Sequence, residues 1–530
     1  MKKRYILGFL VAGATLLASC TKNFEELNTN PDKTTGEFID PNYLLSQSQI
    51  TFSQTGYDQL LFQSMWVQSL ASTFNYYYNG DKYVLASAGT GYYTYTWNRA
   101  YQGYTLIYEM KQLIKDKAEY ANLNACGTIM TALMMQRLTD LYGSIPYTEA
   151  AQAKYGNLTP KFDTQEFIYT DLLKQLETAT ATLDASKAGP TTDLFYGGSV
   201  DRWKRLGYSV MLRMAMRLVK VAPEMAKQYT EKAYAGGTMK EIDDNARVMA
   251  DVNNASNSNS DVLRTPDDFR EVRWGKTLID YMKTTNDPRI PAIAEITTKN
   301  GLTANQTQTA GNNTASLQMG MPNGYTTSSI ANAPGYPGAT PADPAVQGDA
   351  PAPLGKYSRP RFDVYATDRG SANFIYTYGE SELLLAEAAT KGWAAGNAAE
   401  HYKNALTADL ATLAKYNASG VAAVAPADIT AYVNAHPLLT STALEQINME
   451  YWVTTSATFN FNESFANWRR SGYPVLTPVT FTGQYINGQV PRRMPYPTTL
   501  LSTNNANYQA AVKGMGGSDD FATRVWWDKQ

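Results

Sequence analysis

The sequence predicts an all-α-dominated fold, with helices packed in pairs and one long, irregular, loop-rich insertion. Apolar residues recur at helical spacing in several segments of the chain. A hairpin-like pattern of small residues lies at 379–413, and the helical pattern is lost around 299–355. The 530 residues can bury a large core, either in several domains or in one large helical domain with insertions.

The N-terminus has the layout of a secretory signal. Basic residues at 2–4 precede an apolar run at 6–18, which is shorter than the about 20 residues needed to span a bilayer. Leu17-Ala18-Ser19-Cys20 resembles a bacterial lipobox, in which the cysteine is acylated and becomes the new N-terminus. We therefore expect a lipoprotein signal peptide at 1–19 and lipidation of Cys20. An ordinary signal peptide beside a chance cysteine is the alternative.

Residues 20–41 are polar and rich in turn-forming Asn, Pro, Asp and Gly, which indicates a lipidated tether. The body is expected to follow at 42–530. With the Cys20 sulfur acylated, Cys126 carries the one thiol left in the mature chain, so an internal disulfide is impossible. Its apolar neighbours predict a buried thiol.

Five segments in the first half of the body have helical periodicity: 105–117, 122–141, 163–183, 203–218 and 223–236. Asp163 is placed to cap the third, with Glu166 in capping-box position. Pro223 is expected to open the fifth and Gly236-Gly237 to end it. The apolar faces of the third and fourth are Phe167, Leu172, Leu176, Ala179 and Leu183, then Trp203, Leu206, Val210, Met214 and Leu218.

The segment at 299–355 is an almost uncharged run of Asn, Thr, Gly, Pro and Ala, typical of a long loop-rich insertion. Helical periodicity returns at Glu380. Residues 379–413 predict two helices split at Ala395-Gly396-Asn397. Small residues would let these helices approach closely, as in tetratricopeptide hairpins: Ala386, Ala398 and Ala405.

Several segments, spread in order over nearly the whole chain, resemble the SusD/RagB family, in particular its SusD-like branch. The longest is MQRLTDLYGSIPYTEA at 135–150, a helix followed by a Gly stop and a Pro-Tyr turn. The others are NFEELNTNP at 23–31, PKFDTQ at 160–165, DPR at 287–289, GMPNG at 320–324, WRRSGYP at 468–474, YP at 496–497, NY at 507–508 and TRVWWD at 523–528.

This resemblance implies a SusD-like α-α superhelix, in which tetratricopeptide-like helix pairs accompany an irregular, loop-rich half. It also implies a nutrient-binding lipoprotein of the outer membrane that faces the cell exterior and docks on a SusC-like TonB-dependent transporter. Most of the matching segments have a structural explanation. Arg469 and Arg470 are expected to cap carbonyls or pair with carboxylates, and Trp526 and Trp527 to hold the tail against the body.

Aromatic residues crowd the stretch from 74 to 97, interleaved with Asn and Gly. A sugar ring offers apolar C–H faces and hydroxyl groups, so its recognition needs aromatic platforms edged by amides and carboxylates. The resemblance also implies a ligand loop in this early region. Alternatively, the tyrosines pack between helices; Trp66 and Trp97 are expected in the core. The residues that we expect to bind ligand are Asn75, Tyr77, Tyr78, Asn79 and Asp81.

Catalysis finds little support in the sequence. The two histidines, His401 and His436, are far apart, and neither a metalloprotease motif nor a nucleophile elbow is present. A glycosidase carboxylate pair has no sequence signature. We expect no cofactor; a metal stays unassigned, since calcium sites built from loop oxygens are invisible in sequence. The net charge of −2 gives no basic footprint for nucleic acid.

The predicted function is therefore non-catalytic, cell-surface binding of an oligosaccharide or peptide nutrient. The nutrient would be delivered to a partner TonB-dependent transporter. Two alternatives stay open: a surface hydrolase that trims the same nutrient, and a structural or adhesive lipoprotein.

Overall fold

The computed structural model describes residues 39–85, 92–253, 255–264, 272–296, 310–338, 354–366, 369–486 and 488–529. The signal peptide, Cys20 and most of the tether, as well as 299–309 and 339–353 of the insertion, lie outside these residues. Helices dominate the fold, as the sequence predicts.

The α-helices are α3 (Pro41–Ser53), α4 (Gly56–Leu61), α5 (Gln63–Trp66), α6 (Tyr78–Asp81), α7 (Tyr95–Leu113), α8 (Ala121–Tyr142), α9 (Gln165–Thr182), α10 (Val200–Arg217), α11 (Pro223–Gly236), α12 (Ser258–Arg264), α14 (Lys276–Thr284), α15 (Ile290–Ile293), α16 (Tyr378–Thr390), α17 (Ala398–Thr412), α18 (Pro426–Ala435), α19 (Ala443–Ala457), α20 (Phe461–Ser471), α21 (Leu500–Thr503) and α22 (Asn505–Gly514). Short strands form two-stranded antiparallel pairs: β1 (Leu70–Ala71) with β5 (Arg273–Trp274), β2 (Ile145–Pro146) with β3 (Phe162–Asp163), β4 (Ala246–Met249) with β8 (Ala372–Tyr376), and β6 (Ala294–Glu295) with β7 (Arg359–Pro360).

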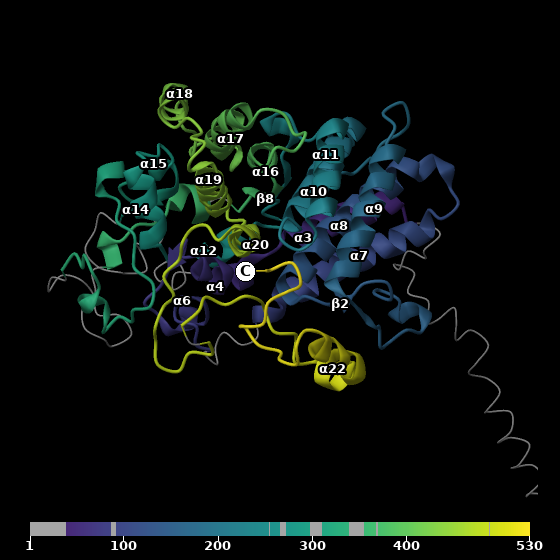
Figure 1. Cartoon of the computed structure of the whole chain (residues 1–530), viewed down its shortest axis with the longest axis horizontal. Helices are drawn as coiled ribbons and strands as arrows, with labels where there is room; N and C mark the ends of the chain where they lie inside the picture. Colours follow the sequence, from purple (N-terminus) through teal and green to yellow (C-terminus); the bar gives the residue numbers. More distant parts are fainter. Residues whose placement is uncertain are drawn as a thin grey trace, which may run out of the picture.

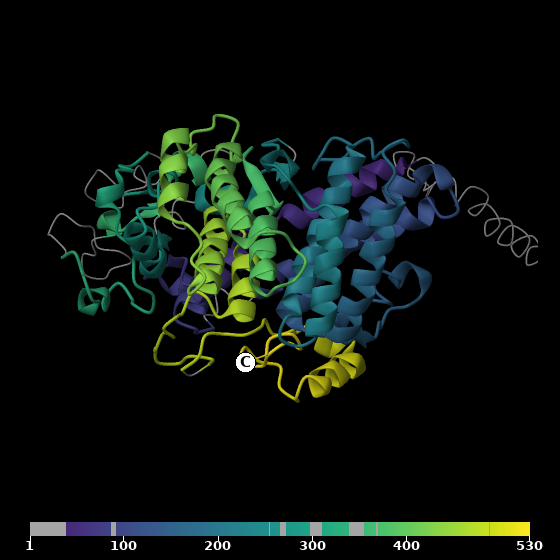
Figure 2. The ribbon, with the colours of Figure 1, turned by 45° about the horizontal axis from the view of Figure 1, so that its top comes forward.

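Two groups of helices build the body (Figure 1). In the first group, α3, α7, α8, α9, α10 and α11 pack successively against one another. In the second, α16 packs on α17 and α19, and α19 packs on α20. Contacts of α10 with α16 and of α20 with α8 join the two groups, which stand side by side in Figure 2. One hydrophobic core runs through both of them.

The predicted hairpin at 379–413 is confirmed as α16 and α17. Thr377 and Glu380 form a capping box at the start of α16. Gly379 lies so close to α17 that a Cβ added there would stand 1.7 Å from Oδ1 of Asp409. A larger residue here would therefore force the buried Asp409 side chain to move.

Three local predictions are corrected. The helix expected at 105–117 begins ten residues earlier, at Tyr95, inside the aromatic stretch that suggested a loop. Thr164 rather than Asp163 caps α9, because the Asp163 carboxylate accepts from the amide and hydroxyl of Thr148. Phe167, assigned to the apolar face of α9, is 46% exposed.

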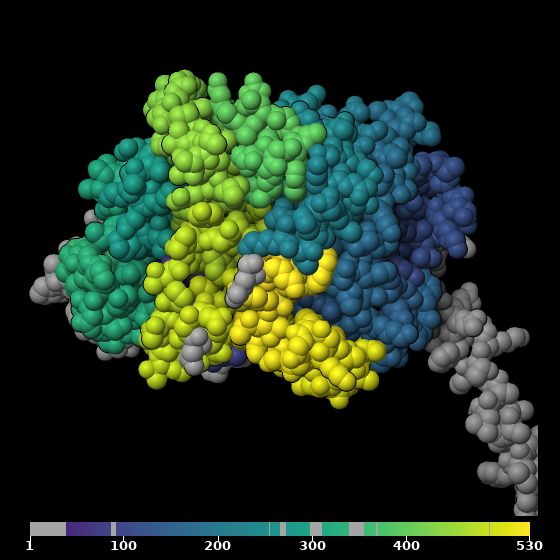
Figure 3. Space-filling view, viewed as in Figure 1, coloured from purple at the N-terminus to yellow at the C-terminus, as the bar shows by residue number. Residues whose placement is uncertain are grey.

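The loop-rich part adds a second, smaller core and a C-terminal arm. Ile330, Ala333 and Tyr357 from the insertion side pack with Ala71 and Phe74, which fastens the insertion to the segment after β1. The C-terminal segment, yellow in Figure 3, lies across the face below both helix groups. Within the described ranges, no helix is long and apolar enough to cross a membrane.

Candidate functional site

The predicted ligand residues lie on η2, a 3₁₀ helix at Asn75–Tyr77, and on the following α6. The side chains of Tyr77, Asn79 and Asp81 are each 0% exposed. A fully buried side chain offers no face to a ligand at the protein surface, so the structure does not support direct ligand contact by these three residues, and their role stays a prediction.

Asp81 fastens the insertion to this segment. Its carboxylate accepts from the backbone N–H of Ser72 (3.2 Å), from Nδ2 of Asn323 (2.7 Å) and from the N–H of Gly324 (2.9 Å). The ammonium of Lys82 lies 2.6 Å from the same carboxylate, and both side chains are 0% exposed. Burial lowers the pKa of Lys82, while the neighbouring carboxylate opposes this shift. The Asp81 carboxylate, which belongs to this buried ion pair, thus holds the GMPNG segment in place.

Asn75 and Tyr78 reach the surface. The side chain of Asn75 is exposed, and Tyr78 is half-buried. The ring of Tyr78 lies edge-on to Phe481 at 5.6 Å and under the Lys82 ammonium at 4.3 Å. Of the five predicted residues, these two keep a face that a ligand can reach.

A cluster of rings next to them forms the candidate binding surface. We call Tyr57, Tyr76, Tyr92 and Tyr95 the tyrosine patch. The ring of Tyr57 lies 4.9 Å from that of Tyr92 and 6.1 Å from that of Tyr76, and Tyr92 stacks on Tyr95 at 5.9 Å. Tyr95 is 38% exposed and the other three are half-buried. The patch presents aromatic faces and phenol hydroxyls together, which suits the C–H faces and hydroxyls of a neutral sugar.

Four separate elements supply the patch: α4, η2, the 3₁₀ helix η4 (Tyr92–Thr94) and the start of α7. The sequence singled out the crowding of aromatic residues from 74 onward, but not the contribution of Tyr57, which tertiary packing brings in. Tyr325 and Tyr336 of the insertion, both partly buried, pack against the small core that contains Phe74. Residues 86–91 of the predicted loop lie outside the described ranges.

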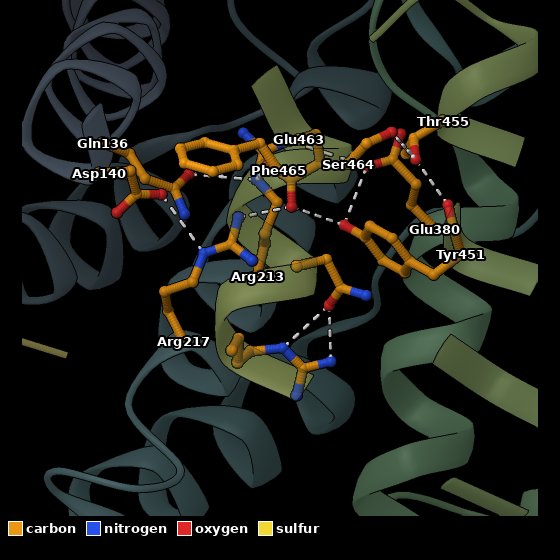
Figure 4. Close-up of polar contacts among 12 residues, drawn as sticks. Gln136, Asp140, Arg213, Arg217, Glu380, Tyr451, Thr455, Glu463, Ser464 and Phe465 are labelled. Atoms are coloured by element: carbon orange, nitrogen blue, oxygen red, sulfur yellow. Dashed lines mark hydrogen bonds and ion pairs between the residues drawn. The ribbon is translucent and has the colours of Figure 1, made fainter. Parts of the chain in front are cut away.

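A buried network of charges joins the two helix groups (Figure 4). Arg217 of α10 lies 2.5 Å from Oε1 of Glu463 on α20 and 3.3 Å from Oδ2 of Asp140 on α8. Arg213, one turn earlier, lies 3.8 Å from Glu463 and 3.9 Å from Glu380 of α16. Each arginine is therefore paired with carboxylates from two other helices.

The pKa values of two carboxylates in this network are shifted in opposite directions. Burial raises the pKa of Glu380 to about 7, with Arg213 opposing the shift. Burial also acts to raise the pKa of Glu463, but Arg217 and Arg213 outweigh it and the pKa is lowered. The cavity between these helices measures about 20 Å³, enough for one water and too small for a substrate. The network therefore has a structural role.

The WRRSGYP segment at 468–474 also has a structural role. Arg470 donates two hydrogen bonds to Glu387 at 2.8 and 2.7 Å, and this pairing outweighs burial and lowers the pKa of Glu387 to about 2. Arg469 donates to the backbone carbonyls of Asp140 and Arg492. Both contacts confirm the structural role predicted for these arginines.

Burial also confirms the predictions made for Trp527, Trp66, Trp97 and Cys126. Trp527 is buried, and its indole N–H donates to Asp140 at 2.7 Å, which ties the tail to the body. Trp66, Trp97 and Cys126 lie in the core. Burial raises the pKa of the Cys126 thiol well above its ordinary value, so the thiolate is disfavoured.

The two histidine side chains have different partners and form no pair. Nδ1 of His401 lies 2.9 Å from Glu382, on the α16–α17 hairpin, whereas Nδ1 of His436 lies 2.8 Å from the carbonyl of Tyr432. Among the residues with a described position, no group of three His, Cys, Asp or Glu side chains is arranged to hold a metal ion.

Paired helices, a loop-rich insertion and an aromatic surface patch define a helical ligand-binding protein. Residues 32–497 match the model of the SusD-like family, whose description is starch-binding and associating with the outer membrane. The chain therefore belongs to the SusD-like family. A search of curated proteins gave no match.

Solved structures agree with this membership. A chitin-binding protein is 30% identical, with a TM-score of 0.78 over 93% of this chain and 100% of the other. A chitin-binding SusD homologue from Flavobacterium johnsoniae is 22% identical, with a TM-score of 0.70 over 92% of this chain and 99% of the other. A SusD homologue from Bacteroides uniformis is 21% identical, with a TM-score of 0.72 over the same shares. The family thus supports carbohydrate binding and association with the outer membrane at a general level.

Proposed function

We propose that the protein captures an oligosaccharide at the cell surface on the tyrosine patch, without breaking any bond in it. The observation that carries this proposal is the clustering of Tyr57, Tyr76, Tyr92 and Tyr95, four rings from four elements, none of which is fully buried. Stacking on these rings would supply contact area, and hydroxyl and amide groups would orient the ligand. A peptide nutrient is the second ligand class to be tested.

Capture and delivery form one function in this proposal. Acyl chains on Cys20 would hold the body at the outer membrane, facing the cell exterior. A SusC-like TonB-dependent transporter would then receive the ligand. Family membership supports the membrane location, and the sequence at 17–20 supports the anchor.

Titration of the purified protein with chitin, starch and peptide oligomers tests the binding role. We expect heat exchange with at least one oligosaccharide and no shorter product after prolonged incubation, because the buried carboxylates of Asp140 and Glu463 are paired with Arg217 and line a cavity too small for a substrate. Calorimetry measures the first result, and mass spectrometry of the recovered ligand measures the second. A shortened product would establish the hydrolase alternative instead, and an absence of binding to the whole panel would favour an adhesive or structural role.

Substitution of Cys20 by Ser tests the anchor and the partner together. We expect complete loss of incorporated fatty acid, measured by labelling with a palmitate analogue, because the acylated sulfur is removed. The unaltered chain, purified from outer membranes in mild detergent, is expected to bring a TonB-dependent porin with it. Unchanged labelling of the variant would refute the lipidation site, and a native preparation free of any porin would refute delivery.

A further inference from the structure

A second cavity shares no lining residue with the tyrosine patch. It measures about 540 Å³ and opens between the loop after α8, the start of α9, the end of α22 and the C-terminal tail. We call it the tail pocket. It is lined by Gly143, Ser144, Thr164, Gln165, Glu166, Gly514, Met515, Arg524, Val525, Trp526, Asp528 and Lys529, none of which belongs to the patch. Its volume falls within the range of small-molecule sites.

The walls of the tail pocket are fixed before any ligand arrives. Gln165 donates to the carbonyl of Thr139 and accepts from the N–H of Trp527, which fastens the tail to the start of α9. Asp528 accepts from Nε of Arg492 and from Nη1 of Arg524, each at 2.8 Å. These contacts fix the residues on either side of Trp526, Arg524 before it and Trp527 and Asp528 after it.

Trp526 packs partly against the main core and also supplies an aromatic wall to the tail pocket. Its side chain is half-buried, whereas that of Trp527 is buried and hydrogen-bonded. Within the described part of the chain, its ring stacks on no other aromatic ring and its indole N–H meets no acceptor. An aromatic face next to an available N–H donor, with Met515 nearby, is a platform for the apolar face and hydroxyls of a sugar.

The charges around the tail pocket favour a neutral ligand. Glu166 and Asp528 are balanced by Arg524 and Lys529, so the lining attracts neither anions nor cations as a class. Arg524 uses one N–H on Asp528 and is about one-third exposed, which leaves donors that can face a ligand. Hydroxyl groups can bond to both the guanidinium and the carboxylate of Glu166.

We infer that the tail pocket is a second binding site for a neutral saccharide, with Trp526 as its platform. This inference rests on the proposed function, because the same ligand class is assigned to both sites. A glycan long enough to offer several sugar units would meet two separate surfaces of one protein.

The test uses chitohexaose and maltohexaose with the purified protein, Trp526→Ala, and the patch variant Tyr76→Ala/Tyr95→Ala. We expect two binding phases by calorimetry, the weaker of which becomes at least about tenfold weaker in Trp526→Ala and persists in the patch variant. Saturating ligand should also slow backbone hydrogen exchange at 514–529 in the unaltered protein, a readout that does not depend on how the variant folds. Tyr155→Ala, at an exposed tyrosine outside both sites, serves as control.

The outcomes separate the two proposals. If Trp526→Ala binds like the unaltered protein and exchange at 514–529 does not change, while the patch variant loses binding, the tail pocket is refuted and the proposed function stands. If neither sugar binds the unaltered protein and no exchange changes, both are overturned for these glycans.

Discussion

Replacement of Arg217 by Ala is expected to lower the free energy of unfolding by about 3–5 kcal/mol. The Arg217 side chain is 1% exposed and lies between Glu463 and Asp140. Its removal would leave two buried carboxylates without their main cationic partner, in a cavity with room for no more than about one water. Because these carboxylates come from α20 and α8, the contact between the helix groups would weaken.

Thermal unfolding measures this effect. For a chain of this length about 1 kcal/mol corresponds to roughly one degree, so Tm should fall by about 3–5 °C. Arg202→Ala is the matched control, since Arg202 is 36% exposed and lies 3.8 Å from Asp244, which keeps Arg205 at 2.6 Å. The control should cost less than about 1 kcal/mol. Equal shifts in the two variants would show that the network does not join the helix groups.

The patch variant Tyr76→Ala/Tyr95→Ala is expected to weaken glycan binding at the tyrosine patch by about 100-fold. It removes two of the four rings: Tyr95, on which Tyr92 stacks, and Tyr76, which lies 6.1 Å from both Tyr57 and Tyr92. Neither side chain is fully buried, so little core packing is lost. Calorimetric titration with the best ligand of the panel measures the change.

Two controls accompany this measurement. Tm of the patch variant should stay within about one degree of the unaltered protein, which separates lost contacts from lost folding. Tyr155→Ala, whose side chain is 52% exposed on another segment, should bind normally. If the stronger binding phase of the patch variant has the same affinity as that of the unaltered protein, the main binding site is not the patch.

Most helix positions could be predicted from the sequence because they depend on local patterns. The apolar spacing that predicts 122–141 and 223–236 corresponds closely to α8 and α11, and the small residues at 379–413 correspond to the α16–α17 hairpin. Amphipathic periodicity and caps are properties of neighbouring residues, so they can be recognised without any knowledge of the fold. The start of α7 was missed because Tyr95 belongs to an aromatic run whose Asn and Gly content suggests a loop, although Trp97 was expected in the core.

The candidate site behaves differently. Composition marked residues 74–97, but it could not distinguish the buried Tyr77 from the partly exposed Tyr76 beside it. Asp81 has the residue type of a ligand-binding carboxylate. Asn323 and Gly324 nevertheless pack against it, so its buried carboxylate binds these two residues of the insertion. Which face of a short helix is covered depends on segments that arrive from far along the chain.

The sequence by itself determined the family, the helical class and the expectation of a lipid anchor, since each rests on contiguous motifs. Only the tertiary structure decided which tyrosines gather at one surface, that Tyr57 joins them, and that Trp526 lines a pocket while Trp527 holds the tail. The physical reason is that burial and contact are set by long-range packing of side chains, and a linear pattern does not specify which distant segment will cover a given residue.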